Sequence, residues 1–208
     1  TYTGPCYRLP MSEAFLSGTP STAPWIMQSI DLGGQWMNTI LSTFPGSGPY
    51  VGEGMLVFEG FRAVDGAEAR ISTPLISFAD ATYPELRFHF YYVDLSDEDL
   101  RFDDHMTVEV SADGGEFEPI EGADFYQHAA NTGWTEVVVP LHGYAGRQRV
   151  AIGFHGYSAG GFDLLLDNIR VLDNPSGAIA EVEAAADDAP AEYYNLQGMR
   201  IGRAELAP

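Results

Sequence analysis

The sequence predicts an all-β protein of the sandwich or jelly-roll type, and three observations lead to this prediction. Short apolar runs that alternate with other residues recur along the chain, and this period of two is typical of half-buried strands. The 208 residues include 23 Gly and 13 Pro, which suit many turns between short strands. No long amphipathic helical pattern occurs, so packed layers of strands are the expected architecture.

The clearest strand patterns lie in the second half of the chain. The stretch 134–172 contains three alternating apolar runs separated by Gly-rich turns. Residues 85–93 (ELRFHFYYV) place Leu, Phe, Phe and Tyr on one face of a strand. Ala-Asp-Gly-Gly is a hairpin signal, with a return strand expected at 117–120 and a loop at 121–133. Further strands are expected at 11–16, 25–30, 55–61, 67–72, 75–78 and 105–111.

A change of composition after Leu172 divides the chain. Residues 173–191 are Ala-rich and acidic, which predicts a linker, and 192–208 contains two short strand-like runs about a Gln-Gly turn. We therefore expect a lead-in at 1–10, one β domain at 11–172, the linker, and a short C-terminal β segment. We also expect the two β parts to fold independently.

The charge of the chain restricts its partners. The formal net charge is −20, and all ten basic residues are Arg. Nucleic-acid binding needs a basic face, so a nucleic-acid partner is not expected. No apolar run is long enough to span a bilayer, so membrane insertion is not expected either. The acidity fits solubility, or the binding of a cation by some of the carboxylates.

Three carboxylates occupy positions that should point toward the core. Glu13 shares the phase of Met11, Asp104 that of Met106, and Asp167 that of the apolar residues of the last strand. An inward carboxylate is unfavourable unless it is paired, hydrogen-bonded or bound to a metal. A shared calcium ion would explain all three, because calcium accepts carboxylate and backbone oxygens. The alternative is that β-bulges shift the phase and turn these side chains to solvent.

Five stretches, in order, carry a resemblance to a known family. They read ARISTPLIS, PELRFHFYY, DDHMTVEVSADGGEFEPI, GWTEVVVPLHGYAGRQRVAIGFHG and LLLDNIRV. Over residues 11–172 the sequence resembles the cleaved-adhesin or choice-of-anchor J family of MAM-like domains. The resemblance implies a two-sheet antiparallel jelly-roll sandwich with a bound calcium, in a module of a secreted or surface-displayed bacterial protein. It implies no catalytic activity.

The resemblance also bears on the metal ligands and on the tail. It supports Glu13 and Asp167 as calcium ligands, although Leu16 stands where the family usually has a second acidic residue. Asp31, in its Gly-rich turn, is an additional candidate, and the carboxylate at 104 rests on its phase alone. The expected calcium ligands are therefore Glu13, Asp31, Asp104 and Asp167. The tail EYYNLQGMRIG resembles the start of the sorting module of proteins exported by the type IX pathway.

Aromatic residues near expected turns are candidates for a glycan platform. Exposed rings can stack on sugar faces, and the candidates are Trp36, Phe125, Tyr126 and Tyr157. The alternative is that these rings cap the ends of the core.

The sequence therefore predicts a non-catalytic, secreted or cell-surface module for adhesion or for recognition of extracellular glycan or protein. One alternative is a carbohydrate-binding module that uses exposed loop aromatics. A glycoside hydrolase is a further alternative, since it needs two carboxylates across a cleft and the chain has thirty acidic residues. The five His residues lack short metal-ligand spacing, and no nucleophile-elbow pattern occurs.

Overall fold

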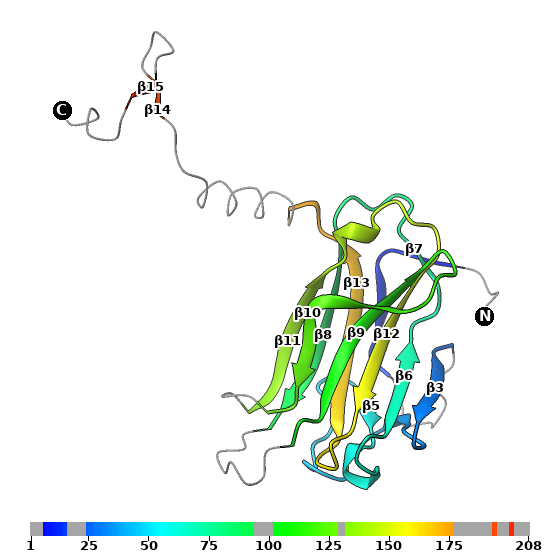
Figure 1. Ribbon diagram of the computed structural model, residues 1–208. Coiled ribbons are helices and arrows are strands. Elements are labelled where there is room, and N and C mark those ends of the chain that lie inside the picture. The colour runs from blue at the N-terminus through cyan, green and yellow to red at the C-terminus, as the bar shows by residue number, and fades with distance from the viewer. Residues whose placement is uncertain are drawn as a thin grey trace. The chain divides into compact units, whose positions relative to one another are not determined.

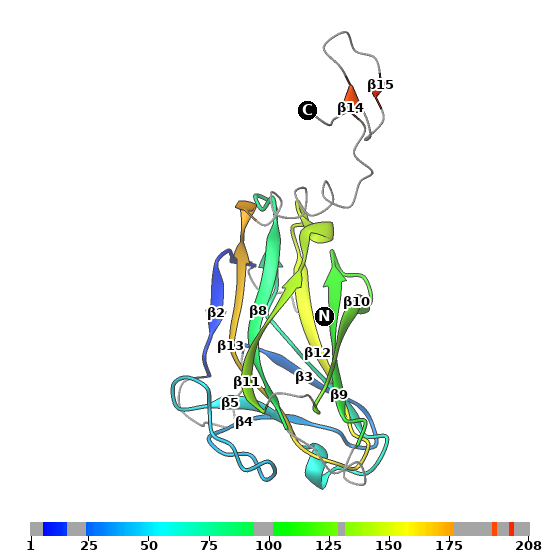
Figure 2. The same cartoon turned by 90° about the vertical axis from the view of Figure 1, so that its left-hand side faces the viewer.

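The predicted all-β fold is confirmed. The computed structural model describes residues 6–15, 24–93, 102–128, 132–176, 193–194 and 200–201. Two sheets pack face to face, and among the described strands only β1 and β7 pair in parallel. Figure 2 shows strands of one sheet on one side of the sandwich and strands of the other sheet opposite them.

The first sheet, called sheet A, has the strand order β10-β9-β12-β6-β3, and β7 with β1 continues beside the start of β12 (Figure 1). Its strands are β1 (Tyr7–Arg8), β3 (Ile26–Asp31), β6 (Glu68–Ser72), β7 (Ile76–Ser77), β9 (His105–Ala112), β10 (Glu118–Tyr126) and β12 (Val150–Tyr157).

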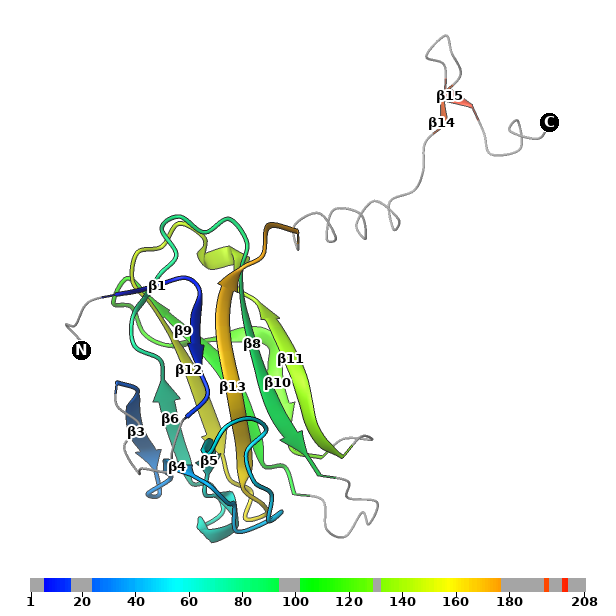
Figure 3. The same ribbon diagram turned by 180° about the vertical axis from the view of Figure 1, so that it is seen from behind.

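The second sheet, called sheet B, has the order β11-β8-β13-β5-β4. Strand β2 lies beside β13, as expected for the first and last strands of a jelly roll (Figure 3). The strands of sheet B are β2 (Met11–Glu13), β4 (Trp36–Thr39), β5 (Met55–Phe58), β8 (Pro84–Tyr92), β11 (Gly133–Pro140) and β13 (Leu164–Asp173). Two 3-10 helices, η1 (Gly60–Arg62) and η3 (His142–Tyr144), lie in the connections.

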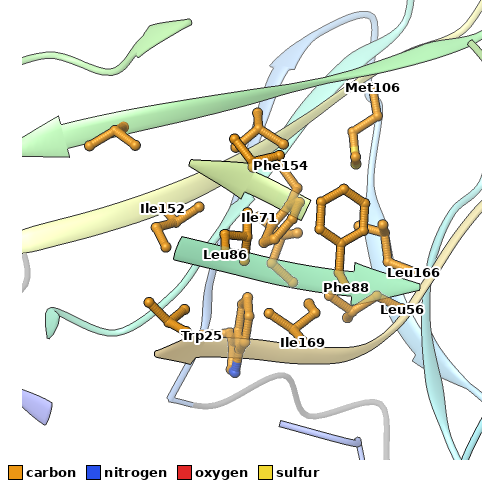
Figure 4. Close-up of a cluster of buried hydrophobic side chains, with 14 of the residues drawn as sticks. Trp25, Leu56, Ile71, Leu86, Phe88, Met106, Ile152, Phe154, Leu166 and Ile169 are labelled. Carbon is orange, nitrogen blue, oxygen red and sulfur yellow. The ribbon is translucent and has the colours of Figure 1, made fainter. Parts of the chain in front are cut away.

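The core lies between the sheets and is built from the predicted alternation. Leu86, Phe88 and Phe90 of β8 are fully buried, as the pattern of 85–93 predicts. The ring of Phe88 meets that of Phe154 edge to face, with centroids 5.6 Å apart, which joins sheet B to sheet A. Figure 4 shows these rings among aliphatic side chains from both sheets.

Strand β10 is longer than the sequence predicts. The return strand expected at 117–120 runs through Tyr126, and it includes part of the loop expected at 121–133. Most of its side chains are exposed, and Ala123 alone of its residues is buried. A register shift between Pro119 and Asp124 also interrupts its pairing with β9. An edge strand with a bulge and a polar surface lacks clear alternation, which explains the missed residues.

The chain divides into two compact units, Thr1–Asp173 and Asn174–Pro208. In the second unit β14 (Tyr193–Tyr194) pairs antiparallel with β15 (Arg200–Ile201), as the tail sequence predicts. The linker expected at 173–191 lies mostly outside the described residues, and independent folding of the two β parts stays a prediction. No described helix has the length and apolarity needed to cross a membrane.

Candidate functional site

A fully buried carboxylate precedes β9 and holds the loop between β12 and β13. Asp104 Oδ1 accepts hydrogen bonds from the amides of Ala159 (3.0 Å) and Gly161 (3.3 Å), and its Oδ2 accepts one from Phe162 (3.3 Å). Burial raises the pKa of Asp104, and these amides oppose the rise. Backbone amides therefore satisfy this inward carboxylate.

A second buried carboxylate of this kind, Asp163, was not predicted from the sequence. Asp163 Oδ2 accepts the amides of Thr43 (2.8 Å) and Phe44 (3.2 Å), while Oδ1 accepts that of Phe61 (3.1 Å). It is almost fully buried, and burial raises its pKa. A signal was present, because this acid stands directly between a Gly-rich turn and an apolar run.

The third buried carboxylate, Asp167, has a different phase from the one predicted. It shares a face with Leu165, turned away from the main core. A register irregularity follows it, with Asn168 at a φ of +49°, and this bulge returns Ile169 and Val171 to the core. The side chain is nevertheless fully buried, because the segment around Val51 covers it and donates an amide hydrogen bond of 2.9 Å.

Two oxygens approach the same backbone position where β2 ends and β5 begins, both beside β13. An added Cβ at Gly54 would lie 2.1 Å from the Phe15 carbonyl oxygen and 2.6 Å from Asn38 Oδ1. That amide oxygen is buried and has no hydrogen-bond donor among the described residues. Burial raises the pKa of Asp167, and the charge of nearby Glu13 raises it further. We call the Phe15 carbonyl and Asn38, together with Glu13 and Asp167 on the paired strands β2 and β13, the oxygen cluster.

The structure brings together two of the four expected calcium ligands. Glu13 and Asp167 belong to the oxygen cluster, on the paired strands β2 and β13. Asp104 is held by loop amides at β9 of the other sheet, and Asp31 is exposed opposite Glu68 at the edge of that sheet. Within the described residues, no three His, Cys, Asp or Glu side chains gather as a metal site. The described part of the chain therefore does not bring all four acids together in one site.

Two of the four expected platform aromatics belong to the core. Trp36 is only 3% exposed, and its indole N–H donates to the Ala69 carbonyl at 3.0 Å. Phe125 points inward and meets Phe88 edge to face at 5.5 Å. These residues lie in strands rather than loops, so the prediction of an exposed loop platform is wrong for them. Their rings fill the space between the sheets.

The other two expected aromatics form a row on the outer face of sheet A. Cross-strand register places His105 opposite Tyr126 on one side and Tyr157 on the other. The His105 ring lies 5.0 Å from each tyrosine ring, with interplanar angles of 33° and 29°. We call these three side chains the ring row, and Glu68 continues it on the next strand, opposite Tyr157. The sequence did not indicate His105, because the row depends on strand register.

A chain of alternating charges lies beside the ring row. Arg70 donates to Glu109, whose other oxygen contacts His155 Nδ1 at 2.9 Å, and His155 Nε2 lies 2.9 Å from Glu68. The bond to Glu109 is the largest cause of a raised pKa at His155. Burial alone would raise the pKa of Glu109, but hydrogen bonds from His155 and Arg70 outweigh it and lower that pKa. These contacts fix the side chains on one rigid face.

A small cavity of about 170 Å³ opens between the ring row and this charged chain. It is lined by Glu68, His105, Thr107, His155 and Tyr157. A larger hollow of about 680 Å³ lies near β1 and β7, and none of the described residues that line it is aromatic. Its Asp173 is already bound to the amides of Thr82 and Tyr83. The ring row is therefore the better candidate for recognition.

Protonation of His155 should make stability depend on pH. The folded-state pKa is raised above 6.5, so this contribution is complete below that value and is lost as pH rises through the folded pKa. We expect the free energy of unfolding to fall over this range in the wild type, and to fall less in His155→Gln. Urea unfolding at a series of pH values from 6 to 9 measures the difference. Identical pH profiles would contradict the proposed charge chain.

Comparison with known proteins gives structural matches only, since neither a family model nor a curated protein matches the sequence. The K2 cleaved adhesin domain of Lys-gingipain is similar with a TM-score of 0.59 and 19% identity, covering 80% of this chain and 99% of that one. The K1 cleaved adhesin domain of Lys-gingipain from Porphyromonas gingivalis W83 gives 0.53 and 20%, covering 79% and 98%.

A structure described as carbohydrate-binding modules from the β-sandwich superfamily is also similar. Its TM-score is 0.51 at 12% identity, and the match covers 74% of this chain and 59% of that one. Similarity at these identities concerns the fold alone. The described β domain thus has the jelly-roll fold of the cleaved adhesin domains, as the resemblance in its sequence predicted.

Proposed function

We propose that this chain is a non-catalytic binding module of a secreted or cell-surface protein, and that it recognises extracellular glycan or protein on the outer face of sheet A. The ring row is the observation that carries the proposal. Tyr126 is 44% exposed at the edge of the sheet, and its ring continues into those of His105 and Tyr157. Aromatic side chains of this kind supply large contact areas at little conformational cost.

The position of the row on three adjacent strands supports recognition. Each ring is attached to a paired strand, so the spacing between rings is set by the backbone rather than by a loop. The neighbouring residues Arg70, Glu109, His155 and Glu68 hold one another, and the surface is prepared before a ligand arrives. The fold is also that of domains described as adhesins and carbohydrate-binding modules, which supports an extracellular location.

The acid–base state of the face favours binding over hydrolysis. A glycosidase pair needs one carboxyl that stays protonated to serve as the general acid. Glu109, a carboxylate of this face, has a lowered pKa and accepts hydrogen bonds from both Arg70 and His155. It is therefore held as an ionised acceptor, which argues against Glu109 as the general acid of such a pair.

We also propose a structural calcium at the oxygen cluster. The donor set suits this ion, because Glu13 and Asp167 supply carboxylates, Asn38 an amide oxygen and Phe15 a backbone oxygen. The buried Asn38 Oδ1 that lacks a donor is the observation that favours a cation there. A bound calcium would supply positive charge to two neighbouring carboxylates. These residues would thereby hold β2 against β13.

The calcium proposal predicts a stability change that depends on Asp167. With calcium at about 100-fold above its dissociation constant, we expect the wild-type melting temperature to rise by about 5 °C over that in chelator. Asp167→Asn should lose this response, whereas Asp104→Asn, which neutralises a buried carboxylate elsewhere, should keep it. Thermal unfolding with and without the ion measures both. No response in the wild type, or an equal response in Asp167→Asn, would refute the site.

The binding proposal predicts that the ring row decides affinity for an extracellular ligand. We expect Tyr126→Ala to weaken binding to the best glycan of an array, or to the best protein of a matched panel, about tenfold, or about 1.4 kcal/mol. Tyr7→Ala is the control, because Tyr7 is equally exposed on β1 of the same sheet. Titration calorimetry measures the affinities. Equal affinity in Tyr126→Ala and wild type, or hydrolysis of the bound glycan, would contradict the proposal.

A further inference from the structure

The tautomer of His105 determines what the ring row offers to a ligand. Its Nδ1 lies 2.8 Å from the carbonyl oxygen of Asp103. A carbonyl oxygen can only accept a hydrogen bond, so Nδ1 carries the proton. In the neutral ring Nε2 is then an acceptor with a free lone pair. The centre of the row therefore presents an acceptor toward a ligand.

The strongest hydrogen-bond donors that line the neighbouring cavity are already bonded to other groups of the protein. The hydroxyl of Thr107 donates to Asp124 Oδ1 at 2.6 Å. Both ring nitrogens of His155 are engaged by carboxylates, those of Glu109 and Glu68. Apart from the Tyr157 hydroxyl, which can donate or accept, the groups left for a ligand are acceptors, namely the Thr107 oxygen, the Glu68 carboxylate and Nε2 of His105. A matching ligand must donate several hydrogen bonds.

The charges beside the cavity disfavour a charged ligand of either sign. Glu68 and His155 both line it, and once His155 is protonated the contact between them puts a negative and a positive group on the same wall. An anionic ligand would approach the Glu68 carboxylate, and a cationic ligand would approach the imidazolium of His155. Glu109, which contacts His155, and Arg70, which contacts Glu109, continue the alternation of negative and positive groups. When His155 is protonated, the four groups together carry no net charge.

On the basis of the proposed binding function, we propose that this cavity and the ring row bind a neutral sugar, whose hydroxyl groups donate to His105 Nε2 and to Glu68. These two residues decide specificity, because both require a hydroxyl donor. Glu68 and the neighbouring His155 also place opposite charges where a charged substituent would sit. A site that accepts hydroxyl hydrogen bonds discriminates against analogues that lack the donor, since its acceptors are then left unpaired beneath the ligand. The rings of Tyr126, which is exposed, and Tyr157, which is half-buried, give the sugar its apolar contact.

The test compares neutral oligosaccharides with their sulfated and uronic-acid counterparts, and with a basic peptide. We expect the wild type to bind a neutral oligosaccharide at least tenfold more tightly than the charged probes. His105→Phe keeps an aromatic ring in the row and removes the acceptor, so neutral-sugar binding should fall about tenfold. Glu68→Gln removes charge with little change of size and should weaken it similarly. Glu121→Gln, an exposed substitution elsewhere on β10, should have no effect.

The outcomes separate this inference from the broader function. Tighter binding of a sulfated sugar or of the basic peptide, with dependence on Tyr126 but not on His105, would overturn the neutral-sugar assignment and leave the binding face in place. Loss of neutral-sugar binding in either His105→Phe or Glu68→Gln, with an unchanged melting temperature, would support it. If no probe depends on Tyr126, then the binding face itself is wrong, and the assignment fails with it.

Discussion

The lower end of the sandwich in Figure 1 depends on buried carboxylates that accept hydrogen bonds from loop amides. Asp104 holds the loop between β12 and β13, and Asp163 holds the segments at Thr43 and Phe61. A buried carboxylate without donors would be strongly destabilising, and a loop without partners would leave its own amides unsatisfied. The loop amides therefore supply the donors that the buried carboxylates need, and the carboxylates supply the acceptors that the amides need. The arrangement fixes four chain segments around one end of the core, where the rings of Phe44, Phe61 and Phe162 also stack on one another.

This constraint connects the core to the proposed binding face. Asp104 stands immediately before His105, the central ring of the row, and the loop that it holds follows Tyr157. The outer faces of the two sheets carry different side chains. Part of the outer face of sheet B is covered, because Leu165 packs there with Met55 and Val57 in a second small core. The outer face of sheet A presents the ring row beside the charged side chains of Arg70, Glu109, His155 and Glu68, which suits reversible contact with a ligand.

The sequence predicts the layers better than the site. Alternation in 85–93 correctly places Phe88 and Phe90 in the core, because burial on one face of a strand leaves a period-two pattern. The same logic is right about the burial of Asp104 and wrong about the phase of Asp167, since the bulge at Asn168 depends on local backbone geometry. The ring row could not be predicted, because its members are 21 to 52 positions apart and meet only through strand register.

The most direct test of this account is amide hydrogen exchange in the loop that Asp104 holds. In the wild type, the amides of Ala159, Gly161 and Phe162 should exchange slowly although they lie in a loop, because their acceptor is buried. In Asp104→Asn, which retains only one of the two carboxylate oxygens, we expect at least one of them to exchange about tenfold faster, while core amides of β8 keep their protection. Exchange in the wild type as fast as in an unstructured peptide, or no change in the variant, would contradict the account.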